Sequence, residues 1–167
     1  MYATTPKDAI IAFLTRPVDG FSAKPETIRF IKERSLPHRQ LHFATFEDEQ
    51  GMQMHFTCHA EEVSDGKWRL NGGYGGSVGG PQVSSPKVYL GGSGDSTGEF
   101  EAGGYVELSG HSVARVQLVS ANNVILEDAV ENDIVLFLAD QFIEFPIEAR
   151  LYDAQGKLLN THPVLPG

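Results

Sequence analysis

The sequence is short of the residues on which several large classes of protein depend. Its 167 residues contain one cysteine, Cys58, so the chain cannot form an internal disulfide. No apolar run approaches the roughly 18 residues that a membrane span needs. The N-terminal stretch lacks the basic start and unbroken apolar core of a signal peptide. We therefore expect a soluble protein, cytoplasmic by default, with the exported portion of a longer product as the alternative.

Basic residues are also scarce. The chain has 13 Lys and Arg against 22 Asp and Glu, a net charge of −9 at pH 7. The deficit lies in residues 86–167, which hold 4 basic and 12 acidic side chains. A nucleic-acid-binding surface needs a basic stripe that displaces counterions, and this half of the chain would repel phosphate. We therefore expect no nucleic-acid partner.

The glycine-rich stretch NGGYGGSVGG, residues 71–80, contains the G-x-S-x-G spacing of a nucleophile elbow around Ser77. That elbow needs a strand before the serine and a helix after it, and Gly79–Gly80–Pro81 cannot begin a good helix. No dinucleotide or phosphate-loop glycine motif occurs either, so we expect no cofactor. Thirteen of the 18 glycines fall between Gly72 and Gly110, which is the composition of a boundary between units.

The first part of the chain predicts a small α+β unit over residues 1–72. Thr5–Asp8 has the capping hydroxyl, proline and acid that begin a helix, and Arg16–Pro17 ends it. Residues 26–34 fit either a strand or a helix, and we favour the strand. Period-two alternation over residues 41–46 and 52–58 predicts a hairpin, followed by a strand at 68–70. We expect the helix to cover the face made by Leu41, Phe43, Met54 and Phe56.

Residues 73–85 are predicted to form a glycine-rich connector, and residues 86–167 an antiparallel β-sandwich. Six or seven short apolar strands follow one another there, with turns roughly every ten residues and no helix signal. This pattern is typical of the immunoglobulin architecture, although the Cys–Trp–Cys hallmark of antibody domains is absent. The predicted fold class is therefore mainly β, a helix on an antiparallel meander followed by an Ig-like sandwich.

Three segments carry a resemblance to other proteins: Trp68–Gly73, Val113–Leu118 and Phe145–Lys157. In them the chain resembles a loose group of uncharacterised bacterial proteins that pair a small α+β segment with a C-terminal Ig-like sandwich. The resemblance implies the same two-part fold and a bacterial source. It implies no activity and supplies no catalytic residues.

Four of the six histidines, His38, His42, His55 and His59, fall in the first hairpin. If paired residue numbers sum to 97, all four lie opposite the apolar face, with His42 facing His55 and His38 facing His59. Directly opposed Cβ atoms are about 4.5–5.5 Å apart, so each pair is a candidate two-histidine metal site that still lacks a third ligand. Without a metal, two imidazoles so close would lower each other's pKa.

Two classes of function remain open. The favoured one is a non-catalytic binding or interaction module for a protein or small ligand, because no catalytic constellation occurs. Its candidate contact residues are Phe142, in the loop 139–144, and Trp68, which we also expect to pack with Phe43, Met54 or Phe56. The alternative is an enzyme, or a metal- or small-ligand-binding protein, that uses the histidine-rich face and a cleft between the two units.

Overall fold

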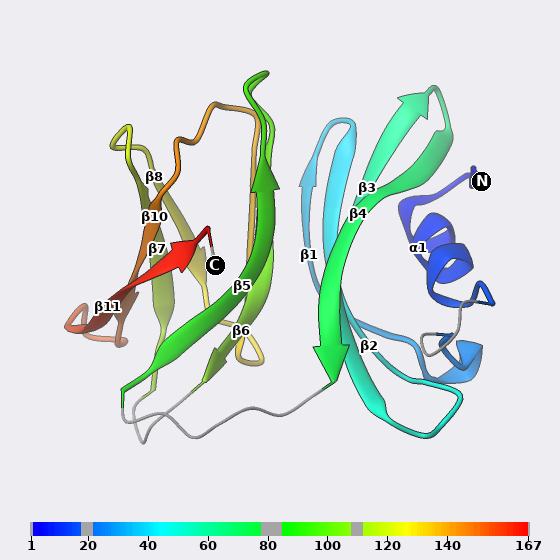
Figure 1. Ribbon diagram of the computed structural model, residues 1–167, viewed down its shortest axis with the longest axis horizontal. Helices are drawn as coiled ribbons and strands as arrows, with labels where there is room; N and C mark the ends of the chain where they lie inside the picture. Colours follow the sequence, from blue (N-terminus) through cyan, green and yellow to red (C-terminus); the bar gives the residue numbers. More distant parts are fainter. Residues whose placement is uncertain (1, 18–21, 78–84, 108–111, 167) are drawn as a thin grey trace. The chain divides into compact units, whose positions relative to one another are not determined.

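The computed structural model describes residues 2–17, 22–77, 85–107 and 112–166. The chain divides into two compact units, Met1–Gly79 and Gly80–Gly167. Within the described ranges there is one α-helix, one short 3₁₀ turn, and three antiparallel sheets (Figure 1). The fold is therefore mainly β, as the sequence predicts.

Helix α1 (Pro6–Leu14) begins where its capping residues predict. The Thr5 Oγ1 atom accepts a hydrogen bond from the Asp8 amide at 3.1 Å, and Pro6 occupies the first helical position. The helix buries Ala9, Ile10 and Leu14. Through this apolar stripe the helix packs against the first sheet.

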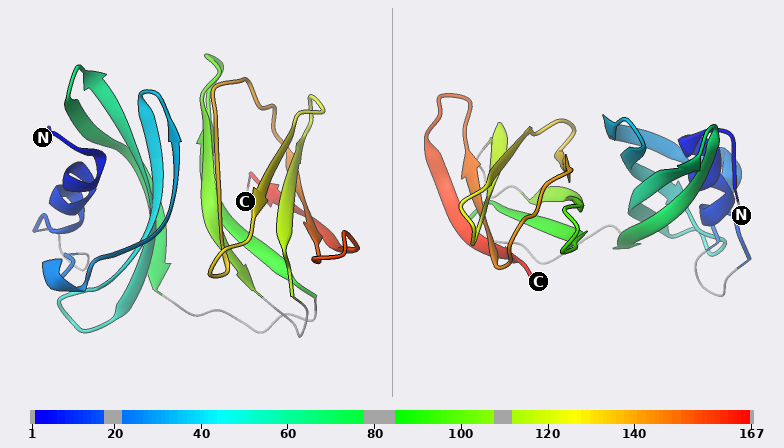
Figure 2. Two further views of the ribbon diagram at one scale, coloured as in Figure 1. Left: turned by 180° about the vertical axis from the view of Figure 1, so that it is seen from behind. Right: turned by 90° about the horizontal axis from the view of Figure 1, so that it is seen from above.

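The first sheet is a meander with the strand order β1-β2-β3-β4. The 3₁₀ turn η1 (Pro25–Thr27) leads into β1 (Arg29–Leu36), which confirms the strand favoured for this segment. The remaining strands are β2 (Arg39–Glu47), β3 (Gln53–Ser64) and β4 (Lys67–Ser77). Helix α1 lies along one face of this sheet (Figures 1 and 2). The core beneath it includes Ile10, Leu14, Ala44, Phe46, Met54 and Cys58.

The predicted register of the first hairpin is wrong. Paired residue numbers of β2 and β3 sum to 100 and not to 97, so that Leu41 lies opposite His59. The reason is the loop Asp48–Met52, in which the Asp48 Oδ1 atom accepts hydrogen bonds from the amides of Gln50 (2.9 Å) and Met52 (2.8 Å). Met52 thus belongs to the loop and is exposed. Helix α1 consequently covers Ala44 and Phe46 with Met54 and Phe56, while Leu41 and Phe43 lie on the opposite face.

Strand β4 is longer than predicted, because residues 73–77 of the expected connector continue it. Glycine is required there by close packing. A Cβ on Gly73 would lie 2.7 Å from the Phe56 Cε1 atom, and one on Gly75 would lie 2.0 Å from the His55 carbonyl oxygen. The ring of Phe56 therefore lies across the bare backbone of β4. Residues 78–84 of the expected connector lie outside the described residues.

Over its described residues, the second unit contains seven strands in two antiparallel sheets. One sheet has the order β5-β6-β9 and the other β11-β10-β7-β8. Their inward side chains form a single apolar core that includes Phe100, Val116, Leu118, Phe137, Ile147 and Leu151. Figure 2 shows the two sheets of this unit facing each other. The bounds are β5 (Lys87–Gly94), β6 (Phe100–Glu107), β7 (Arg115–Ser120), β8 (Ile125–Ala129), β9 (Ile134–Ala139), β10 (Ile147–Tyr152) and β11 (Leu158–Leu165).

Side chains bridge the two seams where an edge strand of one sheet meets an edge strand of the other. At the β8–β9 seam, the Asp128 Oδ2 atom accepts a hydrogen bond from the Leu136 amide at 2.8 Å. At the β5–β11 seam, the His162 Nε2 atom accepts one from the Val88 amide at 3.1 Å, and the Asn160 Nδ2 atom donates one to the Pro86 carbonyl at 2.8 Å. Each of these hydrogen bonds pairs a backbone amide or carbonyl group that an edge strand would otherwise leave without a partner.

Candidate functional site

The four hairpin histidines do not gather into opposed pairs. In the observed register His42 lies opposite Cys58 on the face covered by α1, and His55 and His59 lie on the other face. His38 stands in the turn between β1 and β2. The predicted pairs are therefore wrong, and within the described ranges no three His, Cys, Asp or Glu side chains are placed to hold a metal ion.

His42 is the most enclosed of the four, with a fully buried side chain. Its Nε2 atom lies 2.9 Å from the Gln40 Oε1 atom, while its buried Nδ1 atom has no hydrogen-bond partner among the described residues. Burial lowers the pKa of His42, and Glu33, at 3.8 Å, partly opposes that shift. A neutral ring that donates from Nε2 to the Gln40 amide oxygen fits this environment.

The other three histidines each have a separate neighbour. The His59 Nε2 atom accepts a hydrogen bond from the buried Arg39 at 3.1 Å. The His55 ring stacks on Phe43 with 5.5 Å between centroids, and burial lowers its pKa. The exposed His38 places its Nδ1 atom 2.8 Å from the Glu62 Oε2 atom. These are contacts of individual side chains with the hairpin, so the histidines do not form one site.

The thiol of Cys58 and the G-x-S-x-G spacing around Ser77 are the two features of the sequence that a nucleophilic mechanism would use. Burial raises the pKa of the Cys58 thiol to about 12, which keeps it protonated and unreactive at neutral pH. Ser77 is the last residue of β4, and the next described element is strand β5. A nucleophile elbow places its serine between a strand and a helix, and the described residues provide no such helix.

Trp68 belongs to the core and not to a contact surface. It is 9% exposed and packs with Ala9 and Ala60. Its backbone exchanges two hydrogen bonds of 2.8 Å with Ala3, ahead of helix α1. The predicted contacts with Phe43, Met54 or Phe56 are absent from this cluster, because the β3–β4 register sets Trp68 opposite Glu62, at the far end of β3.

The outer face of the β11-β10-β7-β8 sheet carries a polar network over most of its length. Arg115 pairs with Glu127 and lies 4.1 Å over the Tyr152 ring. The Tyr152 hydroxyl donates to the Gln117 Oε1 atom at 3.1 Å, and the Gln117 Nε2 atom donates to Glu127 at 3.0 Å. The polar groups of these side chains are thus hydrogen-bonded or paired with one another. Since Asp128 points to the β8–β9 seam, the acidic pair Glu127–Asp128 does not converge on a reacting atom.

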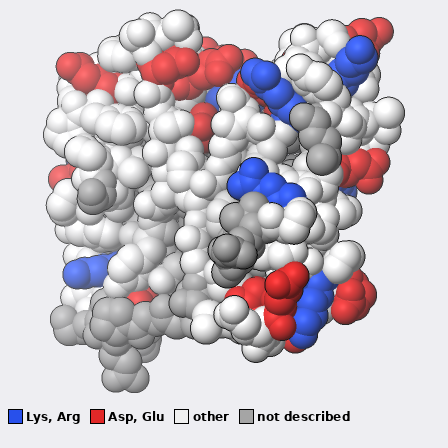
Figure 3. Space-filling model, turned by 45° about the vertical axis from the view of Figure 1, so that its right-hand side comes forward, with Lys and Arg blue, Asp and Glu red and all other residues white. Residues whose placement is uncertain are grey.

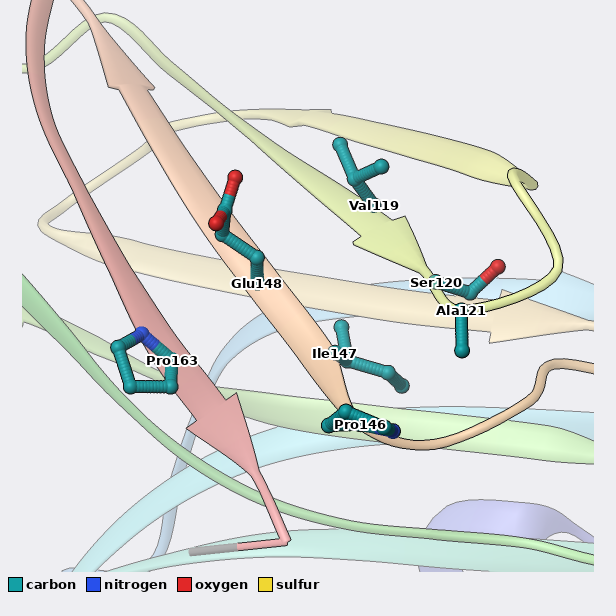
Figure 4. A pocket seen from close by; sticks show the side chains of 7 residues that line it. All are labelled: Val119, Ser120, Ala121, Pro146, Ile147, Glu148 and Pro163. Atoms are coloured by element: carbon teal, nitrogen blue, oxygen red, sulfur yellow. The ribbon is translucent and has the colours of Figure 1, made fainter.

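A shallow depression of about 300 Å³ lies at one end of this sheet, and we call it the Pro146 depression. Val119, Glu148 and Pro163 form a row of paired residues across β7, β10 and β11 (Figure 4). The Ser120 hydroxyl is engaged with the Val124 amide at 2.9 Å, and Glu148 lies 3.4 Å from Arg150. The depression is mainly apolar, and its one carboxylate belongs to Glu148, the middle residue of this row. Its lining residues are Val119, Ser120, Ala121, Pro146, Ile147, Glu148 and Pro163.

Phe142 stands in the connection between β9 and β10, which also carries Pro146. Its side chain is 49% exposed, whereas the neighbouring Ile143 is buried. Asn122 ties this connection to the β7–β8 turn: its Nδ2 atom donates to the Phe142 carbonyl at 3.1 Å, and its Oδ1 atom accepts from the Glu144 amide at 3.0 Å. The Ala121 amide also donates to the Glu144 carbonyl at 2.9 Å. An exposed aromatic side chain is thus held on an anchored backbone at the same end as the Pro146 depression.

Phe142 was predicted from the sequence as a contact residue, whereas the Pro146 depression at the same end of the sheet was not predicted. Val119, Glu148 and Pro163 are 29 and 15 residues apart in the chain, and only the strand order brings them together. Pro163 was the signal that the sequence offered for this surface, because a proline within an apolar strand indicates an edge strand. A surface assembled from three strands cannot be found from spacing alone.

Basic side chains do not form a patch on the face drawn in Figure 3, where they lie apart from one another among acidic and uncharged residues. No described helix has the length and apolar character that crossing a membrane requires. A scan of protein-family models and searches of curated proteins and of solved structures found no match to this chain.

Proposed function

We propose that this protein is a non-catalytic binding module whose contact surface combines Phe142 with the Pro146 depression. One observation carries the proposal: an exposed aromatic side chain and a mainly apolar depression lie at the same end of one sheet, joined by the hydrogen bonds of Asn122. In protein interfaces a few residues, many of them aromatic, dominate the binding free energy, and they lie in well-packed pockets. A protein partner fits this surface better than a small ligand, which usually requires a deeper cavity.

The strand order supports an Ig-like sandwich as the frame of this surface. The first, second and fifth strands of the second unit form one sheet, and the third, fourth, sixth and seventh form the other. This order resembles that of constant-type immunoglobulin domains and differs from it in one pairing, since the fourth strand, β8, pairs with the third and not with the fifth. In such sandwiches the connections at the ends are held by a rigid frame and are free to contact partners.

The proposal is tested by capture of a partner with three forms of the full chain. The immobilised wild type, Phe142→Ser and Leu158→Ser are each incubated with extract of the producing cells, and retained proteins are quantified by mass spectrometry. Leu158 is the matched control, because it is also 49% exposed and begins β11. We expect Phe142→Ser to weaken binding of the retained partner at least about tenfold, which corresponds to ~1.4 kcal/mol, and Leu158→Ser to leave it unchanged. Equal binding by Phe142→Ser and the wild type would contradict the proposal.

A further inference from the structure

The first strand of the second unit is held at its outer edge by two side chains of the last strand. β5 pairs with β6 on one side. On the other side, Val88 and Pro86 are bonded to His162 and Asn160 of β11, at 3.1 Å and 2.8 Å. These two side chains replace the backbone ladder that a neighbouring strand would provide.

The hydrogen bonds of His162 require a neutral ring. The Val88 amide donates to Nε2, so Nε2 must carry a lone pair and no proton. The Nδ1 atom lies 3.0 Å from the Pro163 carbonyl oxygen, which can only accept, so the single ring proton is on Nδ1. A second proton on Nε2 would point at the Val88 N–H group. Protonation therefore replaces an attractive contact by the repulsion of two donors.

The surroundings of His162 also disfavour a positive charge. β11 carries no acidic residue, and the residue opposite His162 on β10 is Ala149. The charged neighbours of Ala149, Glu148 and Arg150, face the other side of the sheet, and the charged group on β5 is Lys87. Burial lowers the pKa of His162; the Pro163 carbonyl opposes this shift, and Lys87 adds to it. No carboxylate on these strands faces the ring to stabilise an imidazolium.

We propose that His162 is a proton-operated latch, which holds the start of β5 against β11 when neutral and releases it when protonated. The Asn160–Pro86 hydrogen bond contains no group that titrates near neutral pH, so the histidine alone gives the seam its pH dependence. Release frees the Val88 amide and opens the edge of β5 to water or to another extended chain. The latch is distinct from the contact surface proposed above, because it acts on β5, which contributes no residue to the Pro146 depression; the two meet only in β11, where Pro163 of that depression follows His162.

Amide hydrogen exchange on the full chain tests the latch. We expect the protection factor of the Val88 amide to fall by up to about tenfold between pH 7.5 and pH 5.5, after correction for intrinsic exchange, because tenfold is the most that one histidine with an ordinary pKa of ~6.5 in the released state allows. Amides of the central strand β10 should keep their protection. In His162→Gln the amide oxygen can still accept from Val88 but does not titrate, so protection should become independent of pH. His38→Gln, which changes an exposed histidine, should behave as the wild type.

Two results would overturn the latch. One is a Val88 protection factor that is the same at both pH values in the wild type, and the other is a pH-dependent loss that persists in His162→Gln. A second measurement does not depend on any variant: the ¹⁵N chemical shifts of the His162 ring at pH 7.5 should show the proton on Nδ1. A ring protonated on Nε2 at that pH would exclude the hydrogen bond on which the latch depends.

Discussion

Gly73 and Gly75 leave room for the ring of Phe56 in the first unit. Each lacks a Cβ where the ring of Phe56 crosses β4, and each would place a Cβ closer than 3.0 Å to a neighbouring atom. Gly76, next in the same strand, has open space around its would-be Cβ. Packing thus explains the glycines at positions 73 and 75, whereas the space around Gly76 does not require a glycine.

Gly73→Ala should therefore destabilise the protein, and Gly76→Ala should not. The new methyl group of Gly73→Ala meets the Phe56 ring, and overpacking of this kind costs about 1–3 kcal/mol in the free energy of unfolding. Phe56→Leu in the same chain should recover part of that loss, because the two residues are in contact. Urea unfolding of the four proteins measures these values. Equal stability of Gly73→Ala and Gly76→Ala would contradict the packing described.

Trp68→Ala should remove the packing of the indole ring against Ala9 of α1 and Ala60 of β3. A buried tryptophan replaced by alanine costs roughly 3–5 kcal/mol. Trp68 is the only tryptophan, so the fluorescence of the native protein reports its surroundings directly. We expect an emission maximum typical of a buried indole. Emission typical of full exposure to water would show that Trp68 does not occupy the core beside Ala9 and Ala60.

Acid should destabilise the fold through His42. Its pKa is lowered by burial, so the folded state takes up a proton less readily than the unfolded chain, whose histidines titrate near ~6.5. The stability due to the neutral ring is therefore complete above that value and falls as the pH drops through it. We expect a lower melting temperature at pH 5.5 than at pH 7.5, and a smaller difference in His42→Leu than in His38→Gln. The same difference in both variants would exclude His42 as a source of the acid sensitivity.

At the scale of elements, helix α1 and most strands follow from local sequence, whereas the pairing of strands does not. The Thr5 cap and Pro6 define the helix start without help from the rest of the fold. The predicted β2–β3 register was wrong because β2 is apolar on both faces: Leu41, Phe43, Ala44 and Phe46 are all buried. Alternation then cannot choose the face, and the loop around Asp48 decides it.

The bridged seams are a second feature that single elements do not reveal. Asp128 follows the exposed Glu127 in the chain, yet it is buried and accepts a hydrogen bond from the Leu136 amide. Asp128→Ala should leave that buried amide without its acceptor and cost about 1–3 kcal/mol in unfolding free energy. Asp128→Asn, which retains a carbonyl oxygen, should cost less. Equal losses in the two variants would show that the hydrogen bond contributes little.

At the scale of the whole molecule, the chain combines two units with separate cores. In the first unit, most of the contacts of the described side chains are those that hold its helix and meander together. The second unit has a satisfied polar network on one sheet and an anchored aromatic side chain at the end of that sheet. This division is the basis of the binding role that we propose for the second unit. The hairpin histidines lie on both faces of the sheet and lack the pairing that favoured a metal.

Hydrogen exchange of the full chain with its captured partner tests the binding role most directly. We expect new protection in the β7–β8 turn around Ala121, in residues 140–148, and around Pro163, which together surround the Pro146 depression. The hairpin that carries His42 and His55 should exchange as it does in the free protein. Protection confined to that hairpin, with residues 140–148 unchanged, would contradict the proposal that the second unit carries the contact surface.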